Sequence, residues 1–409
     1  MKQFIPFWIF LLFFKIAAVL HYGAIAPLGE RVLPLPMVGL LIGTASFIQT
    51  ILDVPAGYLL DRYGYHRLLT LTTIVFILAG GMLLFPFNTP IYILSLLLAS
   101  FGWLFFDPGI NAYSLSWALK KQAGTFMSLR DVFCSIGGVI ATILLGITLM
   151  FSPSILGGII TVSLLISLIF LYFAPKEKQS IQKQALKLPT HSHYIRRHTI
   201  FKTLGFIKQL NPASTMLLLL GFTSSTFYGM VWFVVPLLIA RGSSAEIMSL
   251  GLGIFDFTVV LLGLFLGKLT DRTSKRRLVS VGLLLFTICA FLLSFQFGWF
   301  FLLFGFFATT GDEMASIALW SWLYTLNKEH AHDGLLAGTI NLFHDFGWAV
   351  GPIMAGVLFP FIGPSFTLTT GALLLLFTWL IYKLLLQKYH SPLPNFAVPI
   401  KPHKNRCQI

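Results

Sequence analysis

The chain has 409 residues, of which 56% are hydrophobic and only 10% are charged, and its net charge is +14. This balance excludes a soluble globular domain and indicates an integral membrane protein. The basic residues are spread over short stretches between apolar runs, so they indicate membrane topology and argue against a nucleic-acid partner.

Hydropathy predicts twelve spanning helices, each close to the ~20 residues that cross a bilayer. The expected ranges are 4–25, 37–61, 67–87, 90–117, 125–150, 153–174, 213–240, 245–270, 277–297, 299–326, 335–360 and 363–388. Lys15 interrupts the apolar core of the first run, so we interpret that run as a retained helix and not as a signal peptide. The expected fold class is therefore an all-α integral membrane protein.

Lys and Arg are distributed unequally between the two sets of loops. They are concentrated in the loops after helices 2, 4, 6, 8 and 10 and in the tail, whereas the opposite loops contain only Arg31 and Arg241. The positive-inside rule therefore predicts that both termini are cytoplasmic. We expect a multi-pass protein of the cell inner (cytoplasmic) membrane.

The first and second halves of the chain repeat with a constant offset. Gly57, Asp61, Arg62 and Arg67 recur 210 positions later as Gly267, Asp271, Arg272 and Arg277, and Gly137 recurs as Gly347. One offset in two separated segments indicates an internal repeat. The predicted organisation is a six-helix half at 1–174, a cytoplasmic linker at 175–212, a second six-helix half at 213–388 and a cytoplasmic tail at 389–409.

The short charged stretch between the second and third helices reads Gly57-x-Leu59-x-Asp61-Arg62-x-Gly64-x-x-Arg67. Asp61 lies near a helix C-terminus, the unfavourable end of the helix dipole for a carboxylate, so it needs a cationic partner. This pattern resembles the signature loop of the major facilitator superfamily of secondary transporters, although an ordinary basic turn is the alternative interpretation. The resemblance implies twelve helices in two parallel-repeat halves, with a gate at this loop and at its repeat. Ser274 replaces the second glycine in the repeat, so that turn should be less tight.

Several ionisable residues lie inside the predicted spans. They are Lys15, Asp107, Arg130, Asp131, Asp256, Asp312, Glu313, His344 and Asp345. Each charge near the bilayer centre costs at least ~2.5–3.5 kcal/mol on insertion scales, so such residues face a polar interior and have a partner or a function. The sequence therefore predicts a shared polar interior.

The superfamily resemblance also implies that helices 1, 4, 7 and 10 line a central cavity. On this basis the expected substrate-cavity residues are Lys15, Tyr22, Asp107, Asn111, Tyr228 and Trp232, together with Asp312 and Glu313. Trp103, Asp107 and Asn111 recur at helical spacing on one face of their helix. The alternatives are ordinary aromatic packing and structural ion pairs, such as Arg130 with Asp107 or with Asp131.

Proton coupling needs a group that binds a proton on one side of the membrane and releases it on the other. His344 and Asp345 are the most suggestive pair, because an imidazole titrates near neutral pH. Asp312 and Glu313 are adjacent acids at a similar depth. The hypothesis is that one of Asp256, Asp312, Glu313 or Asp345 carries the coupled proton.

The segment 347–356 contains Gly347, Gly351, Pro352 and Gly356, which allow a bend and close contact between helices. It resembles the glycine-proline gate motif of drug antiporters in this superfamily, which those proteins carry on helix 5, whereas here it lies on helix 11.

No phosphate-binding loop, nucleophile triad or zinc-ligand spacing is present, so the chain is not expected to be an enzyme. We expect no catalytic residue, no metal and no cofactor. The linker histidines His191, His193 and His198 leave a metal site as an alternative, but a solvated basic linker is the favoured interpretation.

The predicted function is a secondary active transporter that works by alternating access. The aromatic content and acidic interior favour an antiporter for proton-coupled efflux of an amphipathic or cationic compound, either a drug or a metabolite such as a siderophore. The alternative is proton-driven uptake of a small nutrient such as an amino acid, in which Lys15 would meet a substrate carboxylate. A non-transporting membrane sensor is a third hypothesis.

The expected partners are the substrate, protons and the lipid bilayer, with no nucleic acid, and the chain is expected to act as a monomer.

Overall fold

A computed structural model describes residues 2–117, 123–176, 212–242, 245–295, 298–326 and 333–388, and all regular structure in these ranges is helical. The elements are η1 (Lys2–Phe4), α1 (Ile5–Glu30), α2 (Leu35–Tyr63), α3 (Tyr65–Met82), α4 (Thr89–Trp117), α5 (Ala123–Thr148), α6 (Pro153–Phe173), α10 (Pro212–Ala240), α11 (Ala245–Arg272), α12 (Lys275–Leu293), α13 (Trp299–Leu326) and α14 (Asp333–Lys388). The linker histidines and the tail lie outside the described residues.

The helix α14 contains two membrane-crossing segments. Gly363 interrupts it with φ 73° and ψ 177°, a backbone conformation that favours glycine, and prolines precede and follow the break. Ten stretches of the described residues are long and apolar enough to cross a membrane, and one of them, Leu342–Leu384, contains this break. Dividing that stretch and adding the shorter apolar helix Ile247–Gly263 gives the twelve spans that hydropathy predicts.

Two of the predicted helix ends were wrong by five residues. The first helix was expected to end at residue 25, but α1 continues through Pro27 to Glu30, because neighbouring helices can satisfy the backbone around a proline in a membrane helix. The third was expected at 67–87, but α3 ends at Met82. The amides of Leu83 and Leu84 donate to the carbonyls of Gly80 and Gly81 in a tighter turn, which ends the helix.

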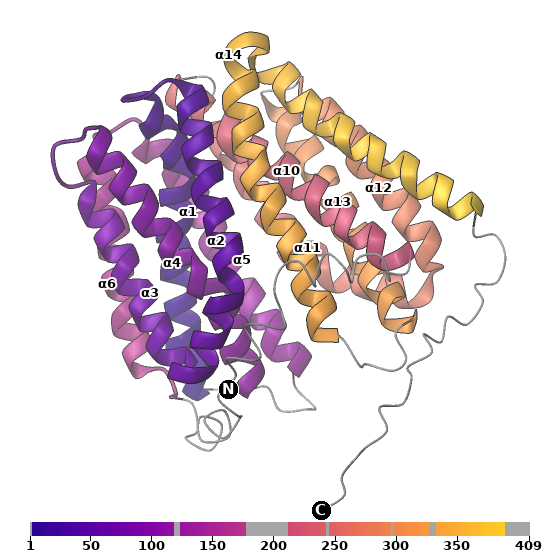
Figure 1. The fold of residues 1–409 in the computed structure, drawn as a ribbon, viewed down its shortest axis with the longest axis horizontal. Coiled ribbons are helices and arrows are strands. Elements are labelled where there is room, and N and C mark those ends of the chain that lie inside the picture. The colour runs from indigo at the N-terminus through magenta and orange to yellow at the C-terminus, as the bar shows by residue number, and fades with distance from the viewer. Residues whose placement is uncertain are drawn as a thin grey trace, which may run out of the picture.

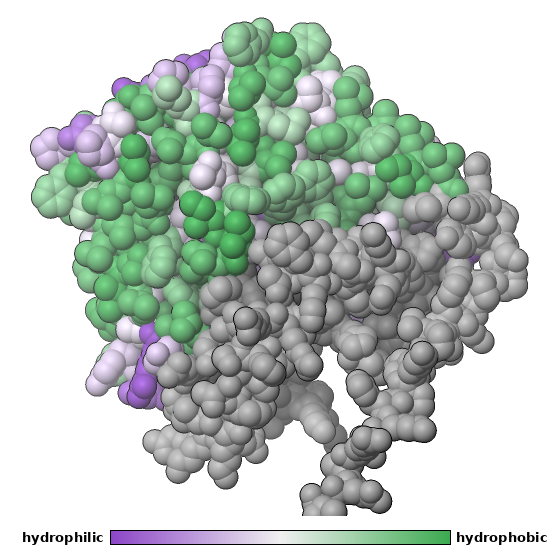
Figure 2. Space-filling model, viewed as in Figure 1, coloured by the Kyte–Doolittle hydropathy of each residue, from purple (hydrophilic) through white to green (hydrophobic). Residues whose placement is uncertain are grey.

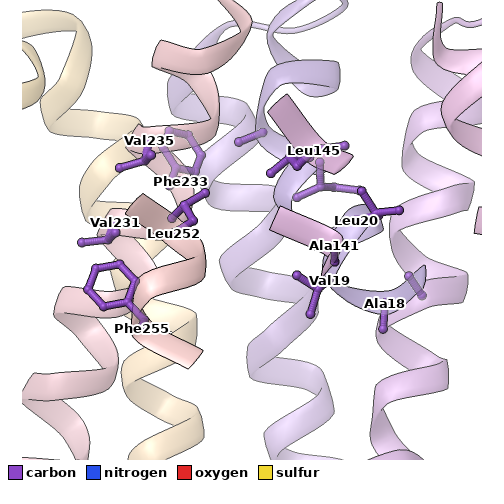
Figure 3. Close-up of a cluster of buried hydrophobic side chains, with 14 of the residues drawn as sticks. Ala18, Val19, Leu20, Ala141, Leu145, Val231, Phe233, Val235, Leu252 and Phe255 are labelled. Carbon is purple, nitrogen blue, oxygen red and sulfur yellow. The ribbon is translucent and has the colours of Figure 1, made fainter. Parts of the chain in front are cut away.

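The helices form two groups that lie side by side (Figure 1), with α1–α6 in one half and α10–α14 in the other. One apolar core includes buried residues of both halves. Figure 3 shows part of it, with Ala18, Val19 and Leu20 of α1 and Ala141 and Leu145 of α5 opposite Val231, Phe233 and Val235 of α10 and Leu252 and Phe255 of α11. The halves are therefore packed against each other and are not separate domains on a tether.

The outer surface of the helices is apolar over much of the visible face (Figure 2). In α6 both sides are apolar: Leu156, Ile160 and Leu164 are buried, whereas Val162 and Ile169 are more than half exposed. A helix that is apolar all round is typical of a membrane span, because lipid contacts one face and protein the other.

The two copies of the repeat differ at their turns. Gly64 alone separates α2 from α3 and has φ 91°, which a residue with a side chain rarely adopts. In the second copy Thr273 and Ser274 separate α11 from α12, and Ser274 has φ −61°. The prediction that the second turn is less tight is therefore confirmed.

Hydrogen bonds tie equivalent positions together in the two halves. The His66 ring bonds through Nε2 to the carbonyl oxygen of Leu171 at 2.9 Å, at the end of α6. In the second half Tyr382 donates its hydroxyl proton to the carbonyl oxygen of Arg276 at 2.8 Å. Since residue 276 is the repeat of residue 66, each half joins the start of its third helix to the end of its sixth, with different chemistry.

Glycines allow the halves to touch at the end of the molecule that contains Glu30, which we call the Glu30 end. A Cβ on Gly39 of α2 would lie 2.4 Å from the carbonyl oxygen of Pro352 and 2.9 Å from the Cα of Gly356 in α14. A Cβ on Gly43 would lie 2.5 Å from the carbonyl oxygen of Ala349. The second half repeats this arrangement, because Gly253 of α11 packs against α5 at Val139 and Thr142. The offset of 210 relates Gly43 to Gly253 and Val139 to Ala349.

We predict that Gly39→Ala weakens the contact between the halves. The added methyl group would overlap backbone atoms that cannot move aside cheaply, and overpacking of this kind costs about 1–3 kcal/mol. We expect a lower apparent melting temperature in detergent, measured by scanning fluorimetry of the intrinsic Trp emission.

Gly81→Ala is the matched control. Gly81 lies in α3, and a Cβ there would meet nothing within 4 Å. Alanine has the higher helix propensity, by about 1 kcal/mol, so this variant should be as stable as the wild type or more stable. Equal melting temperatures for the two variants would contradict a tight contact at Gly39.

Candidate functional site

The candidate site is built from ionisable side chains that five helices bring to the middle of the molecule. Lys15 comes from α1, Asp107 from α4, Asp256 from α11, Glu313 from α13 and Asp345 from α14. Each lies ten or more residues from its nearest helix end, or about 15 Å or more at 1.5 Å per residue. The long apolar helices therefore carry these groups close to the middle of a ~30 Å hydrocarbon layer.

Lys15 packs against an aromatic ring and lies between acids of both halves. Its Nζ atom is 4.9 Å from the centroid of the Trp103 ring in α4, a cation–π distance. It interacts electrostatically with Asp107 of its own half and with Asp256 of the other. It makes no direct ion pair with any residue in the described ranges.

The second interior cation has a direct partner. Arg130 donates to the carboxylate of Asp131 in α5, with Nη2 2.6 Å and Nε 2.9 Å from Oδ1. Asp131 also interacts electrostatically with Glu313 of the other half. Of the two pairings considered from the sequence, the structure has the direct one with Asp131, whereas Asp107 interacts with Arg130 only at longer range.

His344 and Asp345 form a second pair of adjacent residues, with Nδ1 3.2 Å from Oδ1. Both interact electrostatically with Asp107 across the boundary between the halves. His344 also interacts with Asp312. These long-range interactions join the ionisable residues of α4, α13 and α14 into one network.

Asp312 and Glu313 are half-buried in α13 and point in different directions. Asp312 lies beside the Tyr228 hydroxyl, which is also near Thr309. That hydroxyl is buried and has no hydrogen-bond partner of normal geometry in the described part of the chain. A small shift of the Asp312 carboxylate would let it accept a hydrogen bond from this hydroxyl.

Asp256 packs against the backbone of the opposite half. A Cβ on Gly138 of α5 would lie only 2.2 Å from Oδ2 of Asp256. The neighbouring Gly137 packs against α1, where a Cβ would lie 2.9 Å from the Cβ of Lys15. The absence of two consecutive side chains in α5 therefore allows Lys15 and Asp256 to approach from opposite sides.

Three aromatic rings meet where the halves join. Tyr22 of α1 lies 5.9 Å from Trp232 of α10 and 5.8 Å from Trp348 of α14, centroid to centroid, both edge to face. All three side chains are half-buried. Trp348 is also 6.5 Å from the ring of His344. Tyr22 and Trp232 were expected in the cavity from the sequence, whereas Trp348 was not.

The ionisable groups are exposed on the side that leads to Gly64, which we call the Gly64 end. Asp107 is exposed, and the side chains of Asp131 and His344 are 51% and 50% exposed, although all three lie inside membrane spans. They interact with residues of the opposite half, so they face an opening between the halves and not lipid. An opening toward the Gly64 end therefore separates the halves beside these three residues.

The opposite end is closed by a contact between charges. Arg241, at the end of α10, forms an ion pair with Glu30 at the end of α1, and its guanidinium lies 5.0 Å from the Phe359 ring of α14. Arg31 is the repeat partner of Arg241, and it donates to the carbonyl oxygen of Leu149, whose repeat partner is Phe359. Only the second arginine therefore joins the two halves.

The signature-loop residues are placed in part. Gly57 lies within α2, Gly64 forms the turn, Gly267 lies within α11, and Arg67, Arg272 and Arg277 are exposed. The side chains of Asp61, Arg62, Asp271 and Asn111 lie outside what the structure describes. Their expected gate and cavity roles therefore stay predictions.

In the sequence, Arg31 and Arg241 serve only as topology markers, and nothing there pairs Glu30 with Arg241 or connects Gly138 with Asp256. The offset of 210 between the two arginines was a signal that could have drawn attention to them. In the described residues, no three His, Cys, Asp or Glu side chains come together in a way that could hold a metal ion.

Twelve spans in two repeated halves, with a charged interior that opens at one end, define a polytopic membrane transporter. The chain belongs to the Major Facilitator Superfamily, whose family model matches residues 4–218 and again 217–404. This membership makes the chain a transporter and not an enzyme, and it agrees with the fold expected from the signature loop.

Known proteins with a similar sequence or fold include one named for multidrug resistance and transporters of the POT family. The chain is 23% identical over 358 residues to Multidrug resistance protein 2 of Bacillus subtilis (strain 168), covering 81% of this chain and 84% of that protein. It has the fold of a POT family transporter solved with a thioalcohol-conjugated peptide and with 5-aminolevulinic acid. For both structures the TM-score is 0.71 at 12% identity, covering 94% of this chain and 96% of the other.

We predict that Glu30→Gln opens the Glu30 end more often. An exposed ion pair contributes ~0–1 kcal/mol, so its loss should raise the open population a few-fold at most, while the contact of Arg241 with the Phe359 ring stays. Spin labels on Met37→Cys and Phe361→Cys would report the opening by pulsed EPR, because these residues are 55% and 80% exposed at that end. Cys407 is replaced by serine in this background, and Cys134 and Cys289 are buried.

Arg31→Gln is the matched control, since the hydrogen bond of Arg31 to Leu149 stays within one half. It should leave the distance distribution unchanged. A shift of the same size in both variants would show that any loss of charge at this end has the effect and that the Glu30–Arg241 pair does not hold the halves together.

Proposed function

We propose that this transporter is a proton-coupled antiporter that exports cationic or amphipathic organic compounds by alternating access. The observation that carries the proposal is an excess of acids in the interior. The acids are Asp107, Asp131, Asp256, Asp312, Glu313 and Asp345, and the permanent cations are Lys15 and Arg130. An interior with more carboxylates than cations favours a positively charged solute or bound protons, because an excess of negative charge inside a membrane is costly.

The aromatic residues support an amphipathic solute. Tyr22, Trp232 and Trp348 present half-buried rings where the two halves meet, and such rings can stack on an apolar or cationic organic group. The similarity to a protein named as a multidrug resistance protein also favours export of such a compound. The substrate would be a drug or a metabolite with an aromatic or aliphatic body and a positive charge.

We propose that the coupled proton binds within the network formed by Asp256, Asp312, Glu313 and Asp345. Asp312 is the strongest candidate, because it lies beside the Tyr228 hydroxyl and interacts electrostatically with Glu313 and His344. A protonated carboxyl group can donate a hydrogen bond to a hydroxyl oxygen, and an ionised one can accept from it. This acid therefore has a partner in both protonation states.

The transport cycle would move the halves 1–174 and 213–388 against each other around this network. With both termini in the cytoplasm of a cell inner membrane, the Gly64 end faces the cytoplasm, and the opening there would admit a cytoplasmic substrate. The signature-loop residues Asp61 and Asp271 would hold this end closed in the opposite state. The transporter would act as a monomer.

Uptake of a small nutrient such as an amino acid is the second candidate, and the observation that favours it concerns Lys15. Its ammonium group has no direct ion pair among the described residues and could meet a substrate carboxylate. Neighbours of the same fold were solved with a peptide conjugate and with 5-aminolevulinic acid. If the protein takes up acidic nutrients, Lys15→Met would abolish their transport. If it exports cations, the same variant would keep its transport activity.

We predict that adding an organic cation drives a proton flux through the wild-type protein in proteoliposomes with an imposed pH gradient. The assay follows proton flux with a pH-sensitive dye while panels of cationic amphiphiles and of amino acids are added. Asp312→Asn should abolish the coupled flux and keep substrate binding, because the amide can neither take up nor release a proton.

Asp256→Asn, Glu313→Gln and Asp345→Asn are tested beside it, and Asp131→Asn serves as a control because Asp131 is paired with Arg130 and is not a proposed carrier. If amino acids alone drive the flux, the direction and substrate class proposed here are wrong. If substrates exchange without proton movement in the wild type, the acids have structural roles and the protein uses no proton.

A further inference from the structure

Lys15 places a cation on a flexible side chain against an aromatic ring that its neighbours hold in place. The Trp103 ring is held edge to face by three buried neighbours, Phe14, Phe76 and Phe106, at centroid distances of 6.4, 5.7 and 5.5 Å and interplanar angles of 83–89°. These neighbours fix the orientation of the indole. The Nζ atom of Lys15 lies 4.9 Å from its centroid.

Trp103 and Asp107 together have the chemistry of an organic-cation subsite. They are four residues apart in α4 and lie on the same face of the helix. Trp103 is half-buried and Asp107 is exposed to the opening between the halves. An aromatic face beside a carboxylate is the arrangement that binds ammonium and quaternary ammonium groups. In this structure the group that occupies it is the ammonium of Lys15.

Lys15 has an alternative partner on the other side. Asp256 of the second half interacts with it electrostatically, and among the described residues Lys15 is the charged group that acts on Asp256. The Gly137–Gly138 pair leaves both side chains room to approach, because Gly137 packs on the Cβ of Lys15 and Gly138 on the carboxylate of Asp256. The flexible Lys stem can therefore move its charge from Trp103 toward Asp256.

We propose that Lys15 is a built-in competitor of the substrate, whose ammonium group occupies the Trp103–Asp107 subsite until an organic cation displaces it toward Asp256. This inference rests on the proposed export of cations and deepens it by naming the subsite. Displacement moves the Lys15 charge from its own half to an acid of the other half. Substrate binding is thereby linked to an attraction between the two halves, which a neutral solute would not produce.

The test measures binding of tetraphenylphosphonium, an organic cation, to the purified full-length protein by isothermal titration calorimetry. In Lys15→Met the competing charge is lost and the length of the side chain is kept, so the affinity should rise by about tenfold, as expected for the removal of one cation–π competitor and a like charge. Lys15→Arg keeps the charge and should bind as weakly as the wild type.

A second variant shows where the gain arises. Trp103→Leu in the Lys15→Met background should remove the gain, because the platform is lost. Unchanged or weaker binding in Lys15→Met, in a protein with the wild-type melting temperature, would overturn the proposal. A gain that persists without Trp103 would also overturn it, because the competition would then not take place on this ring.

Export is measured in parallel with the wild type in proteoliposomes, so the two ideas can fail separately. If the wild type exports tetraphenylphosphonium in exchange for protons and Lys15→Met binds no more tightly, the competition is wrong and the export function stands. If the wild type exports no organic cation but Lys15→Met binds the probe more tightly, the subsite is supported and the proposed export is wrong.

Discussion

The interior of this protein is governed by the cost of placing a charge away from water inside a bilayer. The ionisable residues in its spans can be tolerated only where they meet other polar groups or an aqueous opening. Within α5 and α14 adjacent residues pair with each other, but the charges of α1, α4, α11 and α13 have to meet polar groups of other helices. In the described part of the chain, α1, α4, α5, α11, α13 and α14 contribute charges to one network at the boundary between the halves. The same boundary is where a solute would have to pass.

The closed end follows from a different constraint, the space that side chains occupy. Gly39 and Gly43 let α2 approach the backbone of α14, and Gly253 does the same for α11 against α5. The contacts of Gly43 and Gly253 are related by the internal repeat, so both sides of the boundary close by similar packing. Charged side chains line the part of the boundary that is open, and glycines allow close helix packing in the part that is closed. A movement of the halves against each other would close the open end and open the closed end.

The sequence predicted the twelve spans, the repeat and the depth of the interior charges, because hydropathy and residue spacing depend on local chain geometry. It also predicted the difference between Gly64 and Ser274, since a positive φ is a property of one residue. It did not predict the Glu30–Arg241 pair or the packing of Asp256 on Gly138. Those contacts join residues more than a hundred positions apart, and their partners are chosen by the way the halves meet. The boundaries of α1 and α3 were missed where Pro27 did not end a helix and where Leu83 and Leu84 formed a turn.

The repeat places an arginine at the same position in each half, Arg31 and Arg241, but an acid precedes only the first of them. Glu30 holds Arg241 of the other half, whereas the position before Arg241 is Ala240, which is exposed and offers Arg31 nothing to bind. The two repeated halves have therefore diverged, so that a symmetric fold is closed by an ion pair on one side only. A duplicated protein of this kind can adjust how readily it opens by changing a single residue in one copy, without disturbing the packing that both copies share.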